Sequence, residues 1–204
     1  QAFAELLGET KLWVSIDRVN MKPPVRKDYP HLDYGFIHWD TDTSNLPNPL
    51  PKPYGVQGVL YLADTAENQG GFQCVPGIYR ELEEYLARQP ADRDPRIPDL
   101  TGYEVEVITG KAGDLVIWDR LLAHGNGHNH ADKPRYAQYI TMYRARDTDE
   151  AARRRRIECW RNLQAPPGDP FPGDPRGWER KTYGQPPELS PLGRKLLGLD
   201  RWDD

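Results

Sequence analysis

The sequence has no long apolar run, no cysteine framework and no stretch dominated by charge of one sign. No run approaches the roughly 18 to 20 apolar residues that span a bilayer, and the N-terminus lacks the basic-then-apolar plan of a signal peptide. Acidic and basic residues are mixed, giving a net charge of -4 without a basic stripe for nucleic acid. We therefore expect a soluble protein that binds neither membranes nor nucleic acid.

Cysteine usage favours a reducing compartment. Cys74 and Cys159 are too few for a disulfide framework, and neither has a second thiol nearby for a zinc site. The cytoplasm is the simplest location. The densest basic run, residues 153–156, follows acidic residues and is typical of the exposed face of a helix. The sequence gives no indication of the oligomeric state.

The length and the absence of repeats predict a single domain over residues 1–204. The chain begins on Gln1, in what reads as the last turns of a helix that ends at Gly8, so we expect that an N-terminal helical portion is missing. From residue 147 a helix and then a Pro/Gly-rich segment predict a C-terminal extension, 147–204, packed on the core. Three aromatic side chains of this extension are expected to dock, since they would be costly to expose: Trp178, Tyr183 and Trp202.

Short β-rich runs separated by turns fill the middle of the chain. The expected strands are 12–20, 56–63, 72–75, 103–109, the run that ends at His124, and 136–143. Helices are expected at 78–89, from an Asp147 N-cap to about 162, and at 190–198. A parallel α/β sheet would need helices between strands, and residues 103–143 leave no room for them. The pattern predicts a mainly β sandwich or barrel with flanking helices.

Two histidines and an aspartate form the candidate metal site. In a strand, side chains at i and i+2 point the same way, so His38 and Asp40 project together from one strand end. With His124 they make the set that binds a divalent metal on one face and leaves other positions open. A second His-x-Asp, His31 and Asp33, lies in a polar loop, whereas His38 ends an apolar run. Any one histidine is more often a surface or capping residue, so the interpretation rests on the combination.

Two arginines are candidates for an anion site. Arg135 opens the strand after His124, where its planar fork could hold a carboxylate of a ligand whose other end reaches the metal. Arg18 shares a predicted strand face with Val14 and Ile16. Either Arg18 lies at the end of an apolar interior and needs an anionic partner, or that face is exposed.

With these motifs the chain resembles the phytanoyl-CoA dioxygenase family of non-haem Fe(II), 2-oxoglutarate-dependent oxygenases. The resemblance runs from about residue 12 to residue 143. It is carried by Lys22-Pro23-Pro24, His38-Trp39-Asp40, Val75-Pro76-Gly77, Gly113-Asp114-Leu115-Val116, and His124-x-Asn126 with Arg135. It implies a double-stranded β-helix, also called a jelly roll or cupin-like fold, with iron at one end of the barrel.

The resemblance also implies roles for individual residues. His38, Asp40 and His124 would be the iron ligands, and Arg135 would pair with the far carboxylate of 2-oxoglutarate. Asn126 falls where the family often has a small polar side chain that touches the same carboxylate.

Other positions are less distinctive. The resemblance implies cosubstrate contacts for Arg18, which favours its interior position, and for Gln57. Val59 departs from an aromatic residue that some members have on this wall. His128 and His130 could form a small metal cluster, but their glycine-rich loop favours roles in the loop or at the substrate mouth.

The implied activity is that of a dioxygenase that uses Fe(II), 2-oxoglutarate and O2. It would oxidise, in the first place hydroxylate, an unactivated C–H bond of a small organic substrate, and release succinate and CO2. Halide-transferring relatives have a small residue where this chain has Asp40, so desaturation or cyclisation are the alternatives to hydroxylation. Two other hypotheses are a non-catalytic jelly-roll binding domain and a cupin-type metalloenzyme that does not use 2-oxoglutarate. The candidate substrate loops, 41–55, 90–98 and 165–187, do not reveal the substrate.

Overall fold

The computed structural model describes residues 1–30, 33, 35–166 and 177–203. These residues belong to two compact units, which are treated separately below. One unit comprises Gln1–Arg18 with Ile140–Asp204, and the other comprises Val19–Tyr139. The single domain over residues 1–204 stays a prediction.

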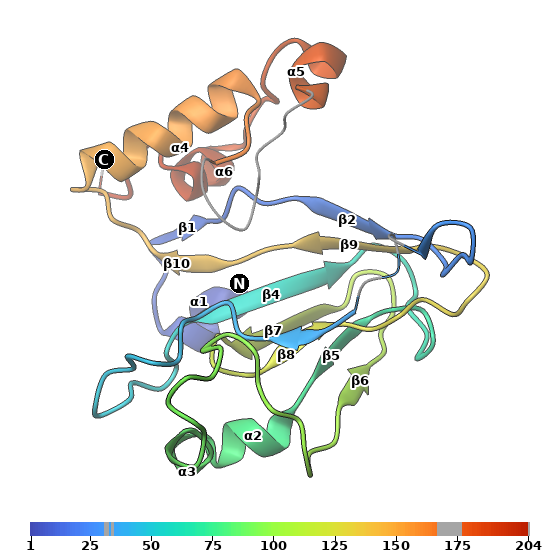
Figure 1. The fold of residues 1–204 in the computed structure, drawn as a ribbon. Helices are drawn as coiled ribbons and strands as arrows, with labels where there is room; N and C mark the ends of the chain where they lie inside the picture. Colours follow the sequence, from blue (N-terminus) through green and yellow to red (C-terminus); the bar gives the residue numbers. More distant parts are fainter. Residues whose placement is uncertain (31–32, 34, 167–176, 204) are drawn as a thin grey trace. The chain divides into compact units, whose positions relative to one another are not determined.

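The unit Val19–Tyr139 contains two four-stranded antiparallel sheets (Figure 1). The first has the order β2 (Val19–Lys22), β9 (Arg135–Tyr139), β4 (Val56–Tyr61) and β7 (Leu115–Asp119). The second has the order β3 (Ile37–His38), β8 (His124–Asn126), β5 (Phe72–Cys74) and β6 (Glu106–Ile108). The chain crosses repeatedly between the two sheets, which is the topology of a jelly roll. The predicted fold class, a double-stranded β-helix, is confirmed.

Alternation along the strands builds the core of this unit. Buried side chains of both sheets form one cluster, because every second residue of a strand faces inward: Val59, Tyr61, Phe72, Cys74, Trp118 and Ala137. A second cluster packs beneath α2 (Pro76–Arg80) and α3 (Leu82–Ala87) and includes Trp39 and Leu121. The single helix expected over 78–89 is therefore two helices. Glu81, with φ -122° and ψ 34°, leaves the helical region and separates them.

Where the other unit is described, it holds a two-stranded sheet and four helices. Its strands are β1 (Leu12–Val14) and β10 (Met142–Arg144), and its helices are α1 (Ala2–Leu7), α4 (Glu150–Asn162), α5 (Trp178–Tyr183) and α6 (Pro191–Leu197). The single strand expected over 12–20 is wrong, because β1 ends at Val14 and β2 starts at Val19. Between the two strands, the Ser15 hydroxyl accepts from the distant Thr141 amide, and the Asp17 carboxylate accepts from the neighbouring Arg18 amide.

The basic run 153–156 was expected to lie on an exposed helix face, but it is only partly exposed. Arg156 is buried, and its guanidinium lies 5.0 Å from the centre of the Trp13 ring. It donates to the Leu197 carbonyl at 2.9 Å and to the Tyr143 hydroxyl at 2.7 Å. This arginine therefore joins α4 to α6 and to the two-stranded sheet.

The N-cap expected for α4 is also corrected. Asp149, not Asp147, caps the helix, and its carboxylate accepts from the Ala152 amide at 3.0 Å. Asp147 instead accepts from the Trp202 amide at 2.8 Å. Asp147, which the local pattern assigned to the cap, is thus bonded to a residue far along the chain instead.

The C-terminal segment only partly matches its prediction. α6 begins after the Ser190 N-cap and ends at Gly198, as expected. Trp202 is partly buried and donates from Nε1 to the Leu12 carbonyl at 3.0 Å. The docking predicted for Trp178 and Tyr183 is wrong, because these side chains are 58% and 70% exposed. Residues 167–176 of the expected loop 165–187 lie outside the described residues, and α5 occupies part of the remainder.

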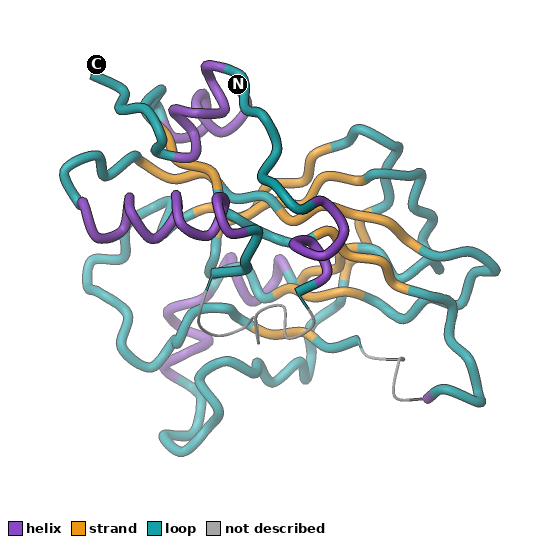
Figure 2. Tube along the Cα trace, turned by 90° about the horizontal axis from the view of Figure 1, so that it is seen from above, coloured by secondary structure: helices purple, strands orange, loops and turns teal. Residues whose placement is uncertain are grey.

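Loops, drawn teal in Figure 2, make up much of the chain, among them the proline-rich segment 41–55. Within the described parts of the chain, no helix combines the length and the apolar character needed to cross a membrane.

Candidate metal centre

The pairing of β3 with β8 brings two histidines together. His38 lies directly opposite His124 in this antiparallel pair, and their ring centres are 5.0 Å apart. The two backbones approach closely because residue 125 is glycine: a Cβ there would lie 1.9 Å from the Phe36 carbonyl oxygen. Cross-strand neighbours share one face of a sheet, so the register alone sets the distance between the two imidazoles.

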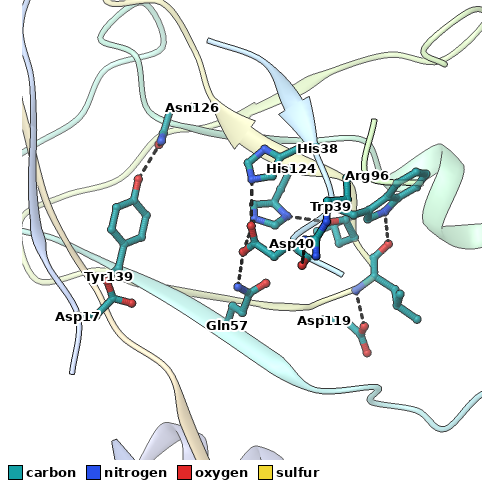
Figure 3. A network of polar contacts seen from close by, with 12 residues as sticks. Asp17, His38, Trp39, Asp40, Gln57, Arg96, Asp119, His124, Asn126 and Tyr139 are labelled. Atoms are coloured by element: carbon teal, nitrogen blue, oxygen red, sulfur yellow. Dashed lines mark hydrogen bonds and ion pairs between the residues drawn. The ribbon is translucent and has the colours of Figure 1, made fainter. Parts of the chain in front are cut away.

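Asp40 completes the group. Its Oδ1 lies 3.1 Å from Nε2 of His38, and its Oδ2 lies 3.8 Å from Nε2 of His124 (Figure 3). One potential ligand atom from each of the three residues falls within 4.8 Å of the others. The structure thus brings the three predicted metal ligands to one place. The competing His31 lies outside the described residues, and Asp33 is bonded to His128 at 2.5 Å.

The protonation of His124 suits a metal ligand. Its Nδ1 lies 2.8 Å from the Leu122 carbonyl oxygen, which can only accept, so Nδ1 carries the proton and Nε2 keeps its lone pair. Burial lowers the pKa of His124 to about 4, so the ring is neutral near neutral pH. A neutral imidazole whose free nitrogen faces Asp40 is the form that binds a divalent ion.

Asp40 is held as a carboxylate. Burial by itself would raise its pKa, but hydrogen bonds from His38 and Gln57 outweigh burial and bring the pKa below its usual range. The Gln57 amide donates to Oδ2 at 2.5 Å. Gln57, expected to contact the cosubstrate, thus contacts the third candidate ligand, and its predicted cosubstrate role stays a prediction.

Backbone contacts that the sequence did not reveal hold this segment in place. Trp39, fully buried, points away from its two neighbours, as alternation requires, and donates from Nε1 to the Leu121 carbonyl at 2.8 Å. The Trp39 amide donates to the Arg96 carbonyl at 2.8 Å, and the Arg96 guanidinium donates to the main-chain oxygen of Asp40. The loop around Arg96, expected only to select the substrate, also fixes the ligand strand.

Arg135 is connected to the strand of His124 through Asn126. It is fully buried, and its Nη1 donates to the Asn126 side-chain oxygen at 2.8 Å and, at 3.5 Å, to that of Asn20. Asn126 in turn donates to the Tyr139 hydroxyl at 2.8 Å. Nε and Nη2 of Arg135 are buried without a hydrogen-bond partner among the residues that the structure describes. A buried guanidinium with two unused donors is costly unless an anion binds there.

Lys22 is a further buried cation that was not predicted as a site residue. It is 1% exposed and lies opposite Arg135 in the β2–β9 pair. Burial lowers the pKa of Lys22; Asp33 opposes the shift and Arg135 adds to it. The sequence signal was present, because Lys22 directly precedes Pro23-Pro24 at the strand end. Two cations side by side in an interior favour an anion between them.

The remaining predicted residues are placed as follows. Arg18 belongs to the other unit, where it is paired with Asp17 at 3.2 Å, and its cosubstrate role stays a prediction. Val59 is fully buried in the core of the sandwich. His128 and His130 are exposed, with ring centres 6.0 Å apart, and neither is part of the metal-ligand group found among the described residues.

Comparison with known proteins assigns the family. A family model described as phytanoyl-CoA dioxygenase (PhyH) matches residues 2–137, two thirds of the chain. The chain belongs to the phytanoyl-CoA dioxygenase family. The residues that match the family model include both sheets of the jelly roll up to Ala137. The three clustered candidate ligands and Arg135 are among them.

Individual relatives of this phytanoyl-CoA dioxygenase family member are distant. Ava biosynthesis cluster protein O of Aspergillus versicolor is 28% identical over 183 residues, which are 78% of this chain and 55% of that protein. Ectoine dioxygenase of Bordetella bronchiseptica is 25% identical over 150 residues, 66% of this chain and 46% of that protein. The chain thus spans about half the length of these curated relatives.

Among solved structures, the epimerase SnoN in complex with Fe3+, α-ketoglutarate and nogalamycin RO matches with a TM-score of 0.50. The two sequences are 20% identical, and the match covers 70% of this chain and 54% of that one. At this identity the likeness shows a shared fold.

Proposed function

We propose that the protein is a non-haem Fe(II), 2-oxoglutarate-dependent dioxygenase that oxidises, most simply hydroxylates, a C–H bond of a small organic substrate. The observation that carries the proposal is the convergence of two imidazoles and a carboxylate in the same barrel as a buried arginine with unused donors. Membership of the phytanoyl-CoA dioxygenase family supports it.

The donor set suits iron. Two imidazole nitrogens and one carboxylate are the facial arrangement of non-haem Fe(II) oxygenases, and three ligands leave positions for further molecules. His38, Asp40 and His124 would hold the ion. Iron at this site, with 2-oxoglutarate as co-reductant, supplies the activation of O2 that oxidation of a C–H bond needs, with release of succinate and CO2.

The protein's own residues prepare that site. The Leu122 carbonyl keeps the proton of His124 on Nδ1, and Gln57 holds one oxygen of Asp40. Phe72 and Trp118 lie against the His124 ring, with ring centres 5.9 and 4.9 Å away, and exclude water from its faces. Orientation of the ligands before the metal arrives is what such surrounding contacts contribute.

2-Oxoglutarate would bind between the metal and the two buried cations. Asn126 lies two residues beyond His124 in β8, roughly 7 Å along the strand at the usual rise, and contacts Arg135. Nε and Nη2 of Arg135 would donate to the far carboxylate, and Lys22 would add its charge. A metalloenzyme that does not use 2-oxoglutarate gives the two unused donors of Arg135 no role.

The test is an assay for succinate with the full chain, loaded anaerobically with Fe(II) and then given 2-oxoglutarate and O2. We expect succinate release that needs both iron and 2-oxoglutarate and falls at least about 100-fold in Asp40→Ala, together with loss of bound iron. Asp64→Ala, an exposed aspartate paired with Lys111, is the matched control and should behave as wild type. Succinate release that persists in Asp40→Ala would refute the proposal.

The substrate is proposed to be a small organic molecule, in line with the name ectoine dioxygenase of a distant relative. Metal-bound protein that forms no succinate, and in which Arg135→Gln changes nothing, would instead favour a cupin-type metalloenzyme. Protein that takes up no metal would favour a binding domain.

A further inference from the structure

The inner face of the β4–β7 pair carries an arginine that the proposed chemistry does not use. Gln57 lies opposite Trp118, and the pairing continues beyond the strands, where the Arg120 amide donates to the Gly55 carbonyl at 2.9 Å. Side chains two residues apart share a face, so the pair Gly55–Arg120 follows Gln57–Trp118 along the inner face. Arg120 therefore belongs to the same wall as Gln57, which contacts Asp40.

This pair lies toward the open end of the wall. On β4 the inward residues Tyr61 and Val59 are fully buried, whereas Gln57 and Gly55 are partly exposed. On β7 Trp118 is 7% exposed and Arg120 is half-buried. This face of the sheet is therefore buried at Tyr61 and becomes accessible to solvent at Arg120. Gln57, which contacts Asp40, lies between these two positions.

The side chain of Arg120 lies across the glycine. A Cβ added to Gly55 would be 2.9 Å from Cδ and 3.6 Å from Cγ of Arg120. The absence of a side chain at position 55 therefore leaves the space that the Arg120 side chain occupies. Among the residues that the structure describes, no carboxylate forms an ion pair with Arg120, and no side chain or carbonyl bonds to its guanidinium.

Polar atoms beside Arg120 also lack partners. Oε1 of Gln57 and Nε1 of Trp118 are buried without a hydrogen-bond partner among the described residues. An acceptor, a donor and a guanidinium on one wall next to Asp40 are the elements of a polar recognition site. The guanidinium makes the site selective for anions, because its fork matches a carboxylate or a phosphate.

We propose that Arg120 binds an anionic group, a carboxylate or phosphate, of the molecule that the enzyme oxidises. The inference rests on the proposed function and adds the substrate class, a small organic anion. Arg135 and Lys22 hold the cosubstrate at the buried end, and Arg120 holds the substrate at the open end. The C–H bond to be oxidised then lies between the bound anion and the metal.

The test is calorimetry with the full chain, loaded anaerobically with Fe(II) and kept in saturating 2-oxoglutarate so that other acids do not compete for Arg135. The probes are straight-chain carboxylic acids of increasing length with their primary amides, and alkyl phosphates with the parent alcohols. We expect at least one acid or phosphate to bind about tenfold or more tightly than its uncharged counterpart. The two series distinguish a carboxylate from a phosphate.

Variants assign the preference to Arg120. Arg120→Gln should remove the advantage of the anion, and Arg120→Lys, which keeps the charge without the fork, should retain part of it. Lys111→Gln, which removes an exposed cation before the start of β7, should leave it unchanged. The proposal is overturned if no anion outcompetes its neutral counterpart in the wild type, or if the advantage survives in Arg120→Gln. Failure of the oxygenase proposal is seen separately, as absent iron or 2-oxoglutarate binding, because calorimetry of the anion series needs no turnover.

Discussion

Two buried arginines, one in each unit, use their guanidinium groups in opposite ways. Every nitrogen of Arg156 donates: Nε to Leu197, Nη1 to Tyr143, and Nη2 to the carbonyls of Leu196 and Val14. In Arg135 only Nη1 has a partner among the described residues. A buried cation in which every nitrogen donates stabilises the fold, whereas one with two nitrogens left without partners is arranged for a ligand.

The strongest test of this comparison is Arg135→Gln. We expect the affinity for 2-oxoglutarate to fall roughly 100- to 1000-fold, about 3–4 kcal/mol, because a buried carboxylate would lose its cation. The free energy of unfolding of the ligand-free protein should not fall. Calorimetric titration of the iron-loaded protein measures the first quantity and urea unfolding the second. Arg88→Gln, which removes an exposed arginine paired with Glu81, is the control. An unchanged affinity for 2-oxoglutarate would leave Arg135 without its proposed role.

Arg156→Met should show the reverse pattern. We expect the free energy of unfolding to fall by about 2–3 kcal/mol, since several carbonyls and the Tyr143 hydroxyl lose their donor. The affinity for 2-oxoglutarate should stay within about twofold of wild type. Urea unfolding followed by circular dichroism gives the stability, and Arg155→Met, an exposed neighbour on α4, should change it by less than about 0.5 kcal/mol. Equal stability of the two variants would contradict the structural role of Arg156.

Lys22→Met sharpens the comparison at the buried end of the barrel. Lys22 adds charge beside Arg135 without a planar fork, so its loss should weaken 2-oxoglutarate about tenfold. A large loss of stability with unchanged 2-oxoglutarate affinity would assign Lys22 to the fold instead.

Asn126→Ala should have the smallest effect. Asn126 positions Arg135 and connects it to Tyr139, so its removal costs one neutral and one charged hydrogen bond near the ligand. We expect the Kd of 2-oxoglutarate to rise by a factor of about 2–10, with iron content unchanged. A loss comparable with that of Arg135→Gln would mean that Asn126 itself holds the cosubstrate.

The sequence placed His38 and Asp40 together because their signal is local. His38 ends β3, Asp40 follows two residues later, and the two side chains lie in one group, as a spacing of two predicts. His124 is placed by the register of β3 with β8, which the family resemblance implied but no local pattern contains.

Predictions that depended on distant partners did less well. Arg156 was expected in solvent, because the carbonyl of Leu197 and the ring of Trp13 that surround it come from remote segments. Asp147 was expected to cap α4, but Trp202 binds it instead. The alternation read over 12–20 ended at Val14, where polar side chains bond to the backbone. Local patterns do not record which remote atoms will meet a side chain.

Because β3 and β8 approach closely at Gly125, the loops between the two strands can change without changing the distance between the two histidines. The distance between the two imidazoles depends on a short ladder of backbone atoms and not on the length of chain between them. Segment 41–55, which lies within that interval, could therefore be replaced by a loop of another length while the spacing of the two histidines stays as it is. A lineage or an engineer could in this way alter what enters the barrel without rebuilding its chemistry, provided that position 125 remains glycine.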